Sequence, residues 1–316
     1  MNNIKQLMLM PLITCSALLC SFASVAGEKV NETLAVKEAT TVAIENLSGK
    51  VNIIGWDKTT IRVKGELDDK AEKLVFEQVG STINIKVELP NHGNWSSEGT
   101  QLTIHMPDNL RVNFESISSD VELENLIHSV TVKTVSGDIK AKNLSQNIEL
   151  SSVSGNIKSR ALHGKIALSV VSGYIDDEGS AGRLELQSVS GEIESNTRAN
   201  EVFANNISGN TELELAEINE LKLSTVSGDS DVSLFLQQNG TVKASSVSGT
   251  VELDFQQAIE ADFRLKANAG GNLINKLTSQ KAQEAKYGPS SKLYFQTGNA
   301  NGSVRVSTVS GDVVVK

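Results

Sequence analysis

A Ser-Gly pair recurs every 18 residues through the middle of the chain, and this repeat constrains the fold more than any other feature. The spacing is constant from Ser136 to Ser208, and the later copies follow at wider intervals. A repeat this short is one supersecondary unit, which must stack on its neighbours to bury an apolar face. The repeated pairs are Ser136-Gly137, Ser154-Gly155, Ser172-Gly173, Ser190-Gly191, Ser208-Gly209, Ser227-Gly228, Ser248-Gly249 and Ser310-Gly311.

Each repeat has the alternating apolar pattern of a β-strand, as in Ile148 to Ile157, and its polar connections are too short for a crossover helix. We therefore predict an all-β fold, a single-stranded parallel β-helix (β-solenoid) with about 18 residues per coil. The general preference of crossover connections predicts a right-handed coil. Nine or ten coils spaced by about 4.8 Å would give a rod about 45 Å long.

Residues 1–26 have the features of a secretory signal peptide. Lys5 is their only charge, Leu7 to Leu19 is an apolar run, and Ser24-Val25-Ala26 supplies small residues for cleavage. Cys15 and Cys20 both lie in this segment, so the mature chain should contain no disulfide. We expect an exported protein without a transmembrane segment after cleavage, in the periplasm, with the cell surface or secretion as alternatives.

Three regions follow from the pattern of strands and loops. Residues 27–110 should form an irregular N-terminal β cap, and residues 111–316 the regular solenoid, with an irregular excursion around 270–296. The last strand, Asp312 to Lys316, is expected at the end of the rod. An unpaired edge there could accept a strand from a partner.

The repeated serine does not have the surroundings of a nucleophile, which needs a positioned base and an oxyanion hole. The four histidines, at 92, 105, 128 and 163, share no phase with it. We predict a structural role, in which the glycine permits a turn and the serine hydroxyl bonds nearby backbone. We expect no catalytic, metal or cofactor site, and we interpret Asp176-Asp177-Glu178 as a solvated acidic turn because calcium-loop spacing is absent.

The direction of the side chains around each Ser-Gly pair cannot be read from the alternation alone. If Val153 points inward, Ser152 and Ser154 face solvent and begin a hydroxyl column, which Val170 and Asn206 interrupt. Flat hydroxyl arrays of this kind can bind ice or sugars. The other members would be Thr134 and Ser136, Ser188 and Ser190, Thr225 and Ser227, and Ser246 and Ser248.

Aromatic residues in the irregular segments are the candidate binding residues. Trp95 lies in a polar loop, and Tyr287 and Tyr294 lie in the C-terminal excursion. With 29 basic and 38 acidic residues and a formal net charge of −9, the chain is a poor partner for nucleic acid. An envelope protein or a glycan is the expected partner.

The stretches TTVAIENLSGKVNIIGWDKTTIRVKGEL and LTIHMPDNLRV, followed by serial TVSGDI units, resemble the bacterial β-strand-repeat family of unknown function called "putative adhesin", which is related to the head-GIN "putative" autotransporter adhesins. The resemblance implies an envelope-exposed β-helix without assigned catalytic residues. Three hypotheses follow: a noncatalytic exported scaffold with a binding or adhesion surface, a polysaccharide-acting β-helix enzyme, and an envelope-stress or assembly accessory protein. The first is favoured because no catalytic set is evident.

Overall fold

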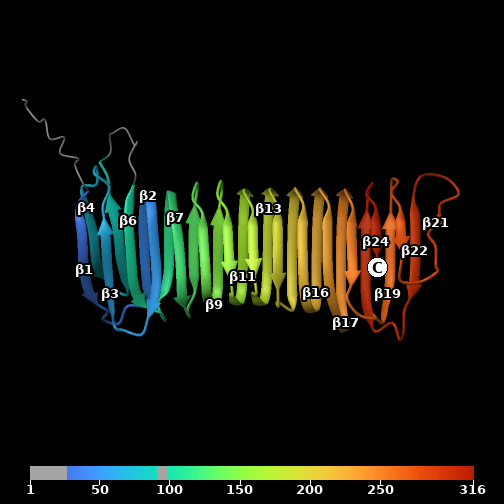
Figure 1. The fold of residues 1–316 in the computed structure, drawn as a ribbon, viewed down its shortest axis with the longest axis horizontal. Helices are drawn as coiled ribbons and strands as arrows, with labels where there is room; N and C mark the ends of the chain where they lie inside the picture. The colour runs from blue at the N-terminus through green and yellow to red at the C-terminus, as the bar shows by residue number, and fades with distance from the viewer. Residues whose placement is uncertain (1–26, 91–98) are drawn as a thin grey trace, which may run out of the picture.

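The computed structural model describes residues 27–90 and 99–316, and within them the chain forms strands and no helix. The 24 strands belong to one continuous sheet that follows a long row of stacked strands in Figure 1. The predicted all-β class is therefore confirmed. The signal peptide predicted at residues 1–26 lies outside the described residues. Among the described residues, no helix is long and apolar enough to cross a membrane.

The middle of the chain consists of parallel strands that pair at the period of the sequence repeat. Ile139 lies beside Ile157, and Ile157 lies beside Ile175, so equivalent residues 18 positions apart are neighbours. The strands of this part are β8 (Val130–Thr134), β9 (Ile139–Ser152), β10 (Ile157–Arg160), β11 (His163–Ser172), β12 (Ile175–Glu178), β13 (Ala181–Ser190), β14 (Ile193–Thr197), β15 (Glu201–Ser208), β16 (Thr211–Ser227), β17 (Ser230–Ser248) and β18 (Val251–Phe255).

The N-terminal part mixes parallel and antiparallel pairs. Its strands are β1 (Lys29–Ala35), β2 (Thr41–Trp56), β3 (Thr60–Glu66), β4 (Lys73–Val79), β5 (Thr82–Glu88), β6 (Thr100–Pro107) and β7 (Arg111–Leu126). Strand β2 pairs in parallel with β7 on one side and with β5 and β6 on the other. Strands β4, β3 and β1 then add antiparallel to this end. The boundary predicted near residue 110 stays a prediction.

The C-terminal strands do not stack in the order of the sequence. They are β19 (Ala261–Ala267), β20 (Leu273–Asn275), β21 (Gln283–Glu284), β22 (Ser291–Gln296), β23 (Gly302–Thr308) and β24 (Val313–Val315). Strand β23 lies between β17 and β19, and β24 lies between β18 and β20. Figure 1 accordingly places the C-terminus inside the row, with β22 beyond it. The expectation of an unpaired edge at Asp312 to Lys316 is wrong, because β24 has a parallel partner on each side.

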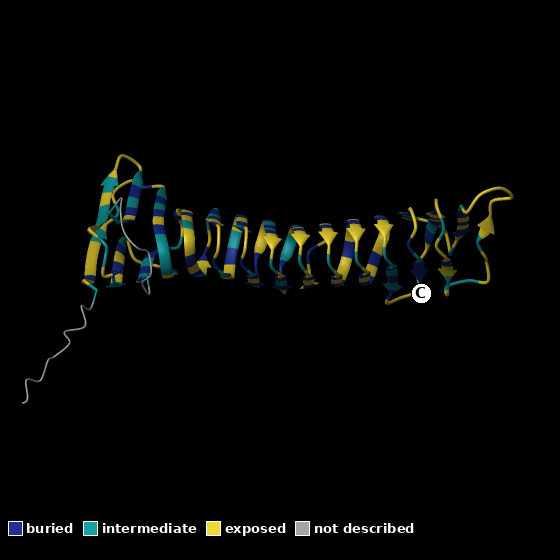
Figure 2. Ribbon diagram, turned by 90° about the horizontal axis from the view of Figure 1, so that it is seen from above, coloured by how far each residue is buried: buried dark blue, intermediate teal, exposed yellow. Residues whose placement is uncertain are grey.

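The core is continuous along the stack, and Figure 2 shows the alternation of buried and exposed residues in each strand. Some inward positions repeat the same residue over several coils. Leu150, Leu168 and Leu186 are neighbours in adjacent strands, and each is 0% exposed. Such columns bury the apolar surface that one repeat could not bury alone.

Candidate functional site

The Val-Ser-Gly segments form one long edge of the molecule. Val153 is 45% exposed whereas Ser152 is 3% exposed, so the condition for the predicted Ser/Thr-x-Ser column is not met. The valine and the following serine both face solvent, and Ser154 donates its backbone N–H to Val135 O of the neighbouring repeat at 2.7 Å. The side chains alternate differently here because the strand bends at the glycine.

The exposed valines and isoleucines form a continuous line, which we call the aliphatic ridge. Its members have exposed fractions between 41% and 53%. A row of exposed serines runs beside it, one per repeat. The ridge consists of Ile117, Val135, Val153, Val171, Val189, Ile207, Val226, Val247 and Val309. Scattered exposed apolar residues are ordinary, but a contiguous apolar surface on a soluble chain marks an interaction site.

The residues that directly precede the ridge valines are buried and form a column inside the stack. Ser152 Oγ donates to Gly137 O at 3.2 Å, and Asn206 Nδ2 donates to Gly191 O at 3.1 Å. These side chains satisfy the carbonyls of the glycine turns. Val170 and Asn206 therefore belong to an inward column and interrupt no exposed array.

Asp177 corrects the interpretation of the acidic run. It lies in β12 and is 2% exposed, so it is not part of a solvated turn. Its carboxylate accepts hydrogen bonds from Ser159 Oγ at 2.6 Å, from Ser195 Oγ at 3.1 Å, and from Ser180 Oγ. Burial raises the pKa of Asp177, and the three serine hydroxyls oppose that rise. Among the described residues, no group of three or more acidic, histidine or cysteine side chains could hold a metal ion.

The histidines of the described residues do not contact the repeat serines. The His105 ring packs on Trp56 with ring centroids 5.2 Å apart. His128 Nδ1 accepts the Ser129 N–H at 2.7 Å, and His163 Nδ1 lies 3.1 Å from Ala161 O. His92 and the candidate residue Trp95 lie outside the described residues.

The two tyrosines proposed as binding residues lie at the C-terminal end of the stack. Tyr287 is 84% exposed and follows β21, and Tyr294 is 51% exposed on β22, opposite Arg264. Both are accessible to a ligand, and their role stays a prediction.

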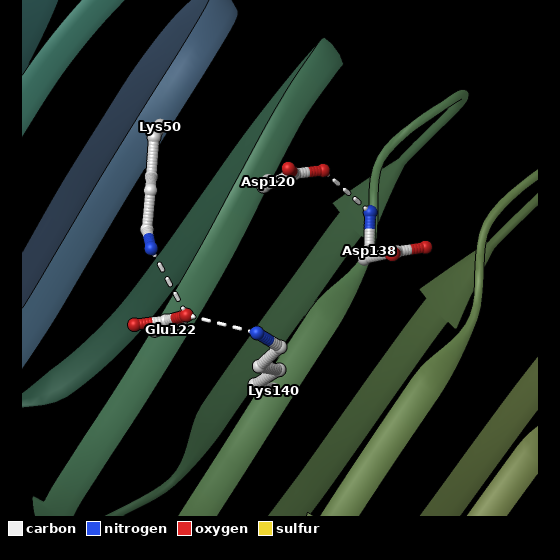
Figure 3. A network of polar contacts seen from close by, with 5 residues as sticks. All are labelled: Lys50, Asp120, Glu122, Asp138 and Lys140. Carbon is white, nitrogen blue, oxygen red and sulfur yellow. Dashed lines mark hydrogen bonds and ion pairs between the residues drawn. The ribbon is translucent and has the colours of Figure 1, made fainter.

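Charges on the outer faces of the strands are balanced near the N-terminal end. Figure 3 shows Glu122 between Lys50 and Lys140, at 3.1 and 3.2 Å, and Asp120 accepting the Asp138 N–H at 2.9 Å. The hydrogen bond from Lys50 and the further bond from Lys140 hold the pKa of Glu122 below its ordinary value.

Further along, acidic residues occupy successive positions of the same column, and in the described part of the chain lysines pair only with its two end members, Lys158 with Asp176 at 3.6 Å and Lys316 with Glu252 at 2.7 Å. Asp176, Glu194, Glu212, Asp231 and Glu252 are direct neighbours in five adjacent strands, and we call this set the acidic ladder. Partial burial, with repulsion by nearby carboxylates, raises the pKa of Asp231. Like charges directly opposite each other destabilise a sheet, so the acidic ladder lowers the stability of the fold by a small amount.

Comparison with known families agrees with this arrangement. The model of the family described as Toastrack DUF4097 matches residues 39–316. The chain belongs to the Toastrack family. Among curated proteins, no match is found. The family match supports the predicted resemblance and the stacked β architecture.

Solved structures resemble this Toastrack chain at low identity. A "putative adhesin" from Parabacteroides distasonis is 13% identical, with a TM-score of 0.50 over 72% of this chain and 97% of the other. One from Bacteroides fragilis is 14% identical, with a TM-score of 0.43 over 92% and 97%. A "putative lipid binding protein" from Parabacteroides distasonis is 14% identical, with a TM-score of 0.48 over 72% and 97%. The first of these likenesses supports the fold alone.

Proposed function

We propose that the chain is a noncatalytic, exported β-solenoid that presents a binding or adhesion surface in the bacterial cell envelope. The aliphatic ridge carries this proposal, because it places nine β-branched side chains in one exposed line. An envelope protein or glycan would cover them and remove apolar surface from water. The similar structure from Parabacteroides distasonis is described as a "putative adhesin", which agrees with this role.

The geometry of the coils belongs to the same proposal. We infer a single-stranded parallel β-helix of right-handed sense, supported by the parallel registers 18 residues apart and by the usual hand of such connections. A rigid stack of this kind would hold the ridge residues at a constant spacing of about 4.8 Å. A crystal structure that shows a left-handed coil would contradict the assignment of hand.

The binding role is tested by cosedimentation of the mature chain with a washed envelope fraction. We expect saturable binding by the wild type and at least tenfold weaker binding by the triple variant Val153→Ser, Val171→Ser, Val189→Ser. These residues are 41% to 45% exposed, so the variant should keep its fold, which circular dichroism checks.

A matched triple variant, Lys142→Ser, Lys165→Ser and Arg198→Ser, alters exposed residues outside the ridge and should bind like the wild type. Equal binding by the ridge variant would contradict the role of the ridge.

A polysaccharide-acting enzyme is the second candidate, because one groove brings charges of both signs together. A groove of about 430 Å³ is lined by Glu122, Glu124, Lys140, Lys142, Lys158, Arg160, Asp176 and Glu178. A general acid at neutral pH needs a raised pKa, whereas the pKa of Glu122 is lowered. The binding role is therefore preferred. Turnover of an envelope polysaccharide that is lost in Glu178→Gln would reverse this preference.

A further inference from the structure

Four cations stand in single file across adjacent strands near the C-terminal end, and we call them the cationic ladder. Lys222 lies beside Lys243, Lys243 beside Arg305, and Arg305 beside Arg264. All four are exposed, on the outer face of the strands β16, β17, β23 and β19. The ladder exists because β23 inserts between β17 and β19.

The two middle cations lack an acidic partner within the described residues. Lys222 Nζ pairs with Glu220 at 2.6 Å, and Arg264 Nε pairs with Asp262 at 2.8 Å, each two residues earlier in its own strand. The equivalent residues before Lys243 and Arg305 are Thr241 and Ser303, which carry no charge. The centre of the ladder therefore has two adjacent, uncompensated positive charges.

Hydroxyl and aromatic groups border the ladder. On one side, Ser224, Ser245 and Ser307 are neighbours in adjacent strands and can donate hydrogen bonds. Tyr294 lies beside Arg264 at one end of the ladder, and Phe203 lies beside Lys222 at the other. The exposed Tyr294 ring offers apolar contact to a flat ligand. The Phe203 ring is already covered by Arg183 and Lys222, whose charged groups lie 4.0 and 4.8 Å from its centroid.

We propose that the cationic ladder binds a linear acidic polysaccharide that lies along the stack, with its carboxylate or sulfate groups on Lys243 and Arg305. This inference rests on the proposed binding function and names a ligand class for a surface separate from the ridge. A narrow polymer fits a single file of charges, with hydroxyl groups on one side and the exposed Tyr294 ring at one end. The protein as a whole has a net negative charge, which repels an anionic polymer from the rest of the surface and favours its binding at the cationic ladder.

A flat membrane and a second copy of the chain fit the ladder less well. An anionic bilayer lying on this face would also meet Glu201, Glu220 and Asp262, which form the neighbouring column with Thr241 and Ser303. A second copy could offer its acidic ladder. However, a patch of four strands measures about 14 Å by 17 Å, or about 240 Å², against about 800 Å² per partner in a typical stable interface.

The test measures binding of the mature chain to polygalacturonate and to heparin at low salt, with dextran as the neutral probe. We expect binding to at least one acidic polymer and none to dextran. The variant Lys243→Gln/Arg305→Gln should bind at least tenfold more weakly and lose part of the salt dependence. The matched variant Lys133→Gln/Lys165→Gln removes two exposed charges elsewhere and should bind like the wild type.

Each contrary outcome has a distinct meaning. Unchanged binding in Lys243→Gln/Arg305→Gln, or no binding to either polymer, overturns the inference. Ladder-dependent binding to vesicles of anionic lipid without polymer binding reassigns the surface to membranes. Ladder-dependent self-association in sedimentation reassigns it to a second copy. If ridge-dependent envelope binding persists in any of these cases, the inference fails while the proposed function stands.

Discussion

At Gly155 the neighbouring repeat leaves no space for a side chain. A Cβ atom there would lie 2.1 Å from Gly137 O, and one at Gly191 would lie 1.7 Å from Gly173 O. The sequence predicts a turn glycine at these positions, and the structure adds close approach of adjacent backbones as a second reason. That contact depends on the stacking distance, which no single repeat encodes.

We expect Gly155→Ala to reduce the free energy of unfolding by about 1–3 kcal/mol, because the methyl group must displace the stacked backbone. Ser154→Ala alters an exposed hydroxyl beside it and should change that free energy by less than about 0.5 kcal/mol. Urea titration of both variants measures the difference. An unfolding midpoint for Gly155→Ala equal to that of the wild type would rule out the close approach.

Asp177 gives a prediction about pH. Its folded-state pKa is raised by burial, so the folded state holds the proton more tightly than the unfolded state does. The contribution of Asp177 to stability should therefore be fully present below the ordinary pKa of 3.8 and should be lost as the pH rises through the raised folded pKa. Asp177→Asn removes this titration and should become more stable relative to the wild type over that range. Denaturant titrations at a series of pH values test this, and a stability difference that is constant with pH would contradict it.

The position of a residue within the repeat indicates whether its side chain is buried. Asp177 has the phase of Ser159 and Ser195, which are buried, so alignment of the repeats could have placed it inside. The four ladder cations likewise lie five positions before Ser227, Ser248, Ala269 and Ser310. The sequence predicts a turn at the glycine but not the direction of the side chains beside it, which leaves Val153 exposed and Ser152 buried.

The C-terminal strands show where reading along the chain fails at the scale of elements. The regular spacing up to Ser208 predicts stacking in sequence order, and between β8 and β18 the registers follow it. Strand β23 then inserts between β17 and β19, and β24 inserts between β18 and β20. Strands β19 and β20 therefore do not pair with the described strands that precede them in the sequence. The wider spacing of the Ser-Gly pairs after Ser208 indicates that this region is irregular, but it does not predict the order in which its strands stack.

Removal of residues 302–316 should therefore disrupt an interior layer. Val313 and Val315 are fully buried, and their loss would expose the facing sides of β18 and β20. We expect rapid proteolysis within residues 258–301 of the truncated chain. Replacement of the exposed segment 279–288 by a Gly-Ser linker should leave the rest of the chain resistant. Limited proteolysis with mass spectrometry measures both, and equal resistance of the truncated and full-length chains would show that the last strands lie outside the core.

The cationic ladder also predicts a cost in stability. Like charges directly opposite in adjacent strands destabilise a sheet by about 0.2–1 kcal/mol per pair. Lys243→Gln/Arg305→Gln should therefore unfold at a higher temperature than the wild type at low salt. The difference should shrink at about 1 M salt, where charges are screened beyond about 3 Å. Calorimetry at two salt concentrations tests this, and a lower unfolding temperature for the variant at low salt would contradict the assignment.

At the scale of the whole molecule, the fold was largely predictable and the binding surface was not. Period and alternation predict stacked parallel strands, and the Toastrack match agrees. The exposed surfaces arise from stacking. Each repeat contributes one valine or isoleucine to the ridge, several repeats contribute one charge to a ladder, and the continuous line exists only in the assembled stack. The repeat serines are evident in the sequence, whereas the exposed hydroxyl column was predicted only for an inward Val153, and Val153 is exposed.

Single-cysteine cross-linking tests the ridge most directly, because both native cysteines lie within residues 1–26. In a chain that starts at residue 27, Val171→Cys places a cross-linker on the ridge, and His163→Cys places it at the other end of β11. We predict a discrete cross-linked envelope component from Val171→Cys alone, which unlabelled wild type displaces and the Val153→Ser, Val171→Ser, Val189→Ser variant does not. The same product from both positions, or none from Val171→Cys, would contradict a binding role for the ridge.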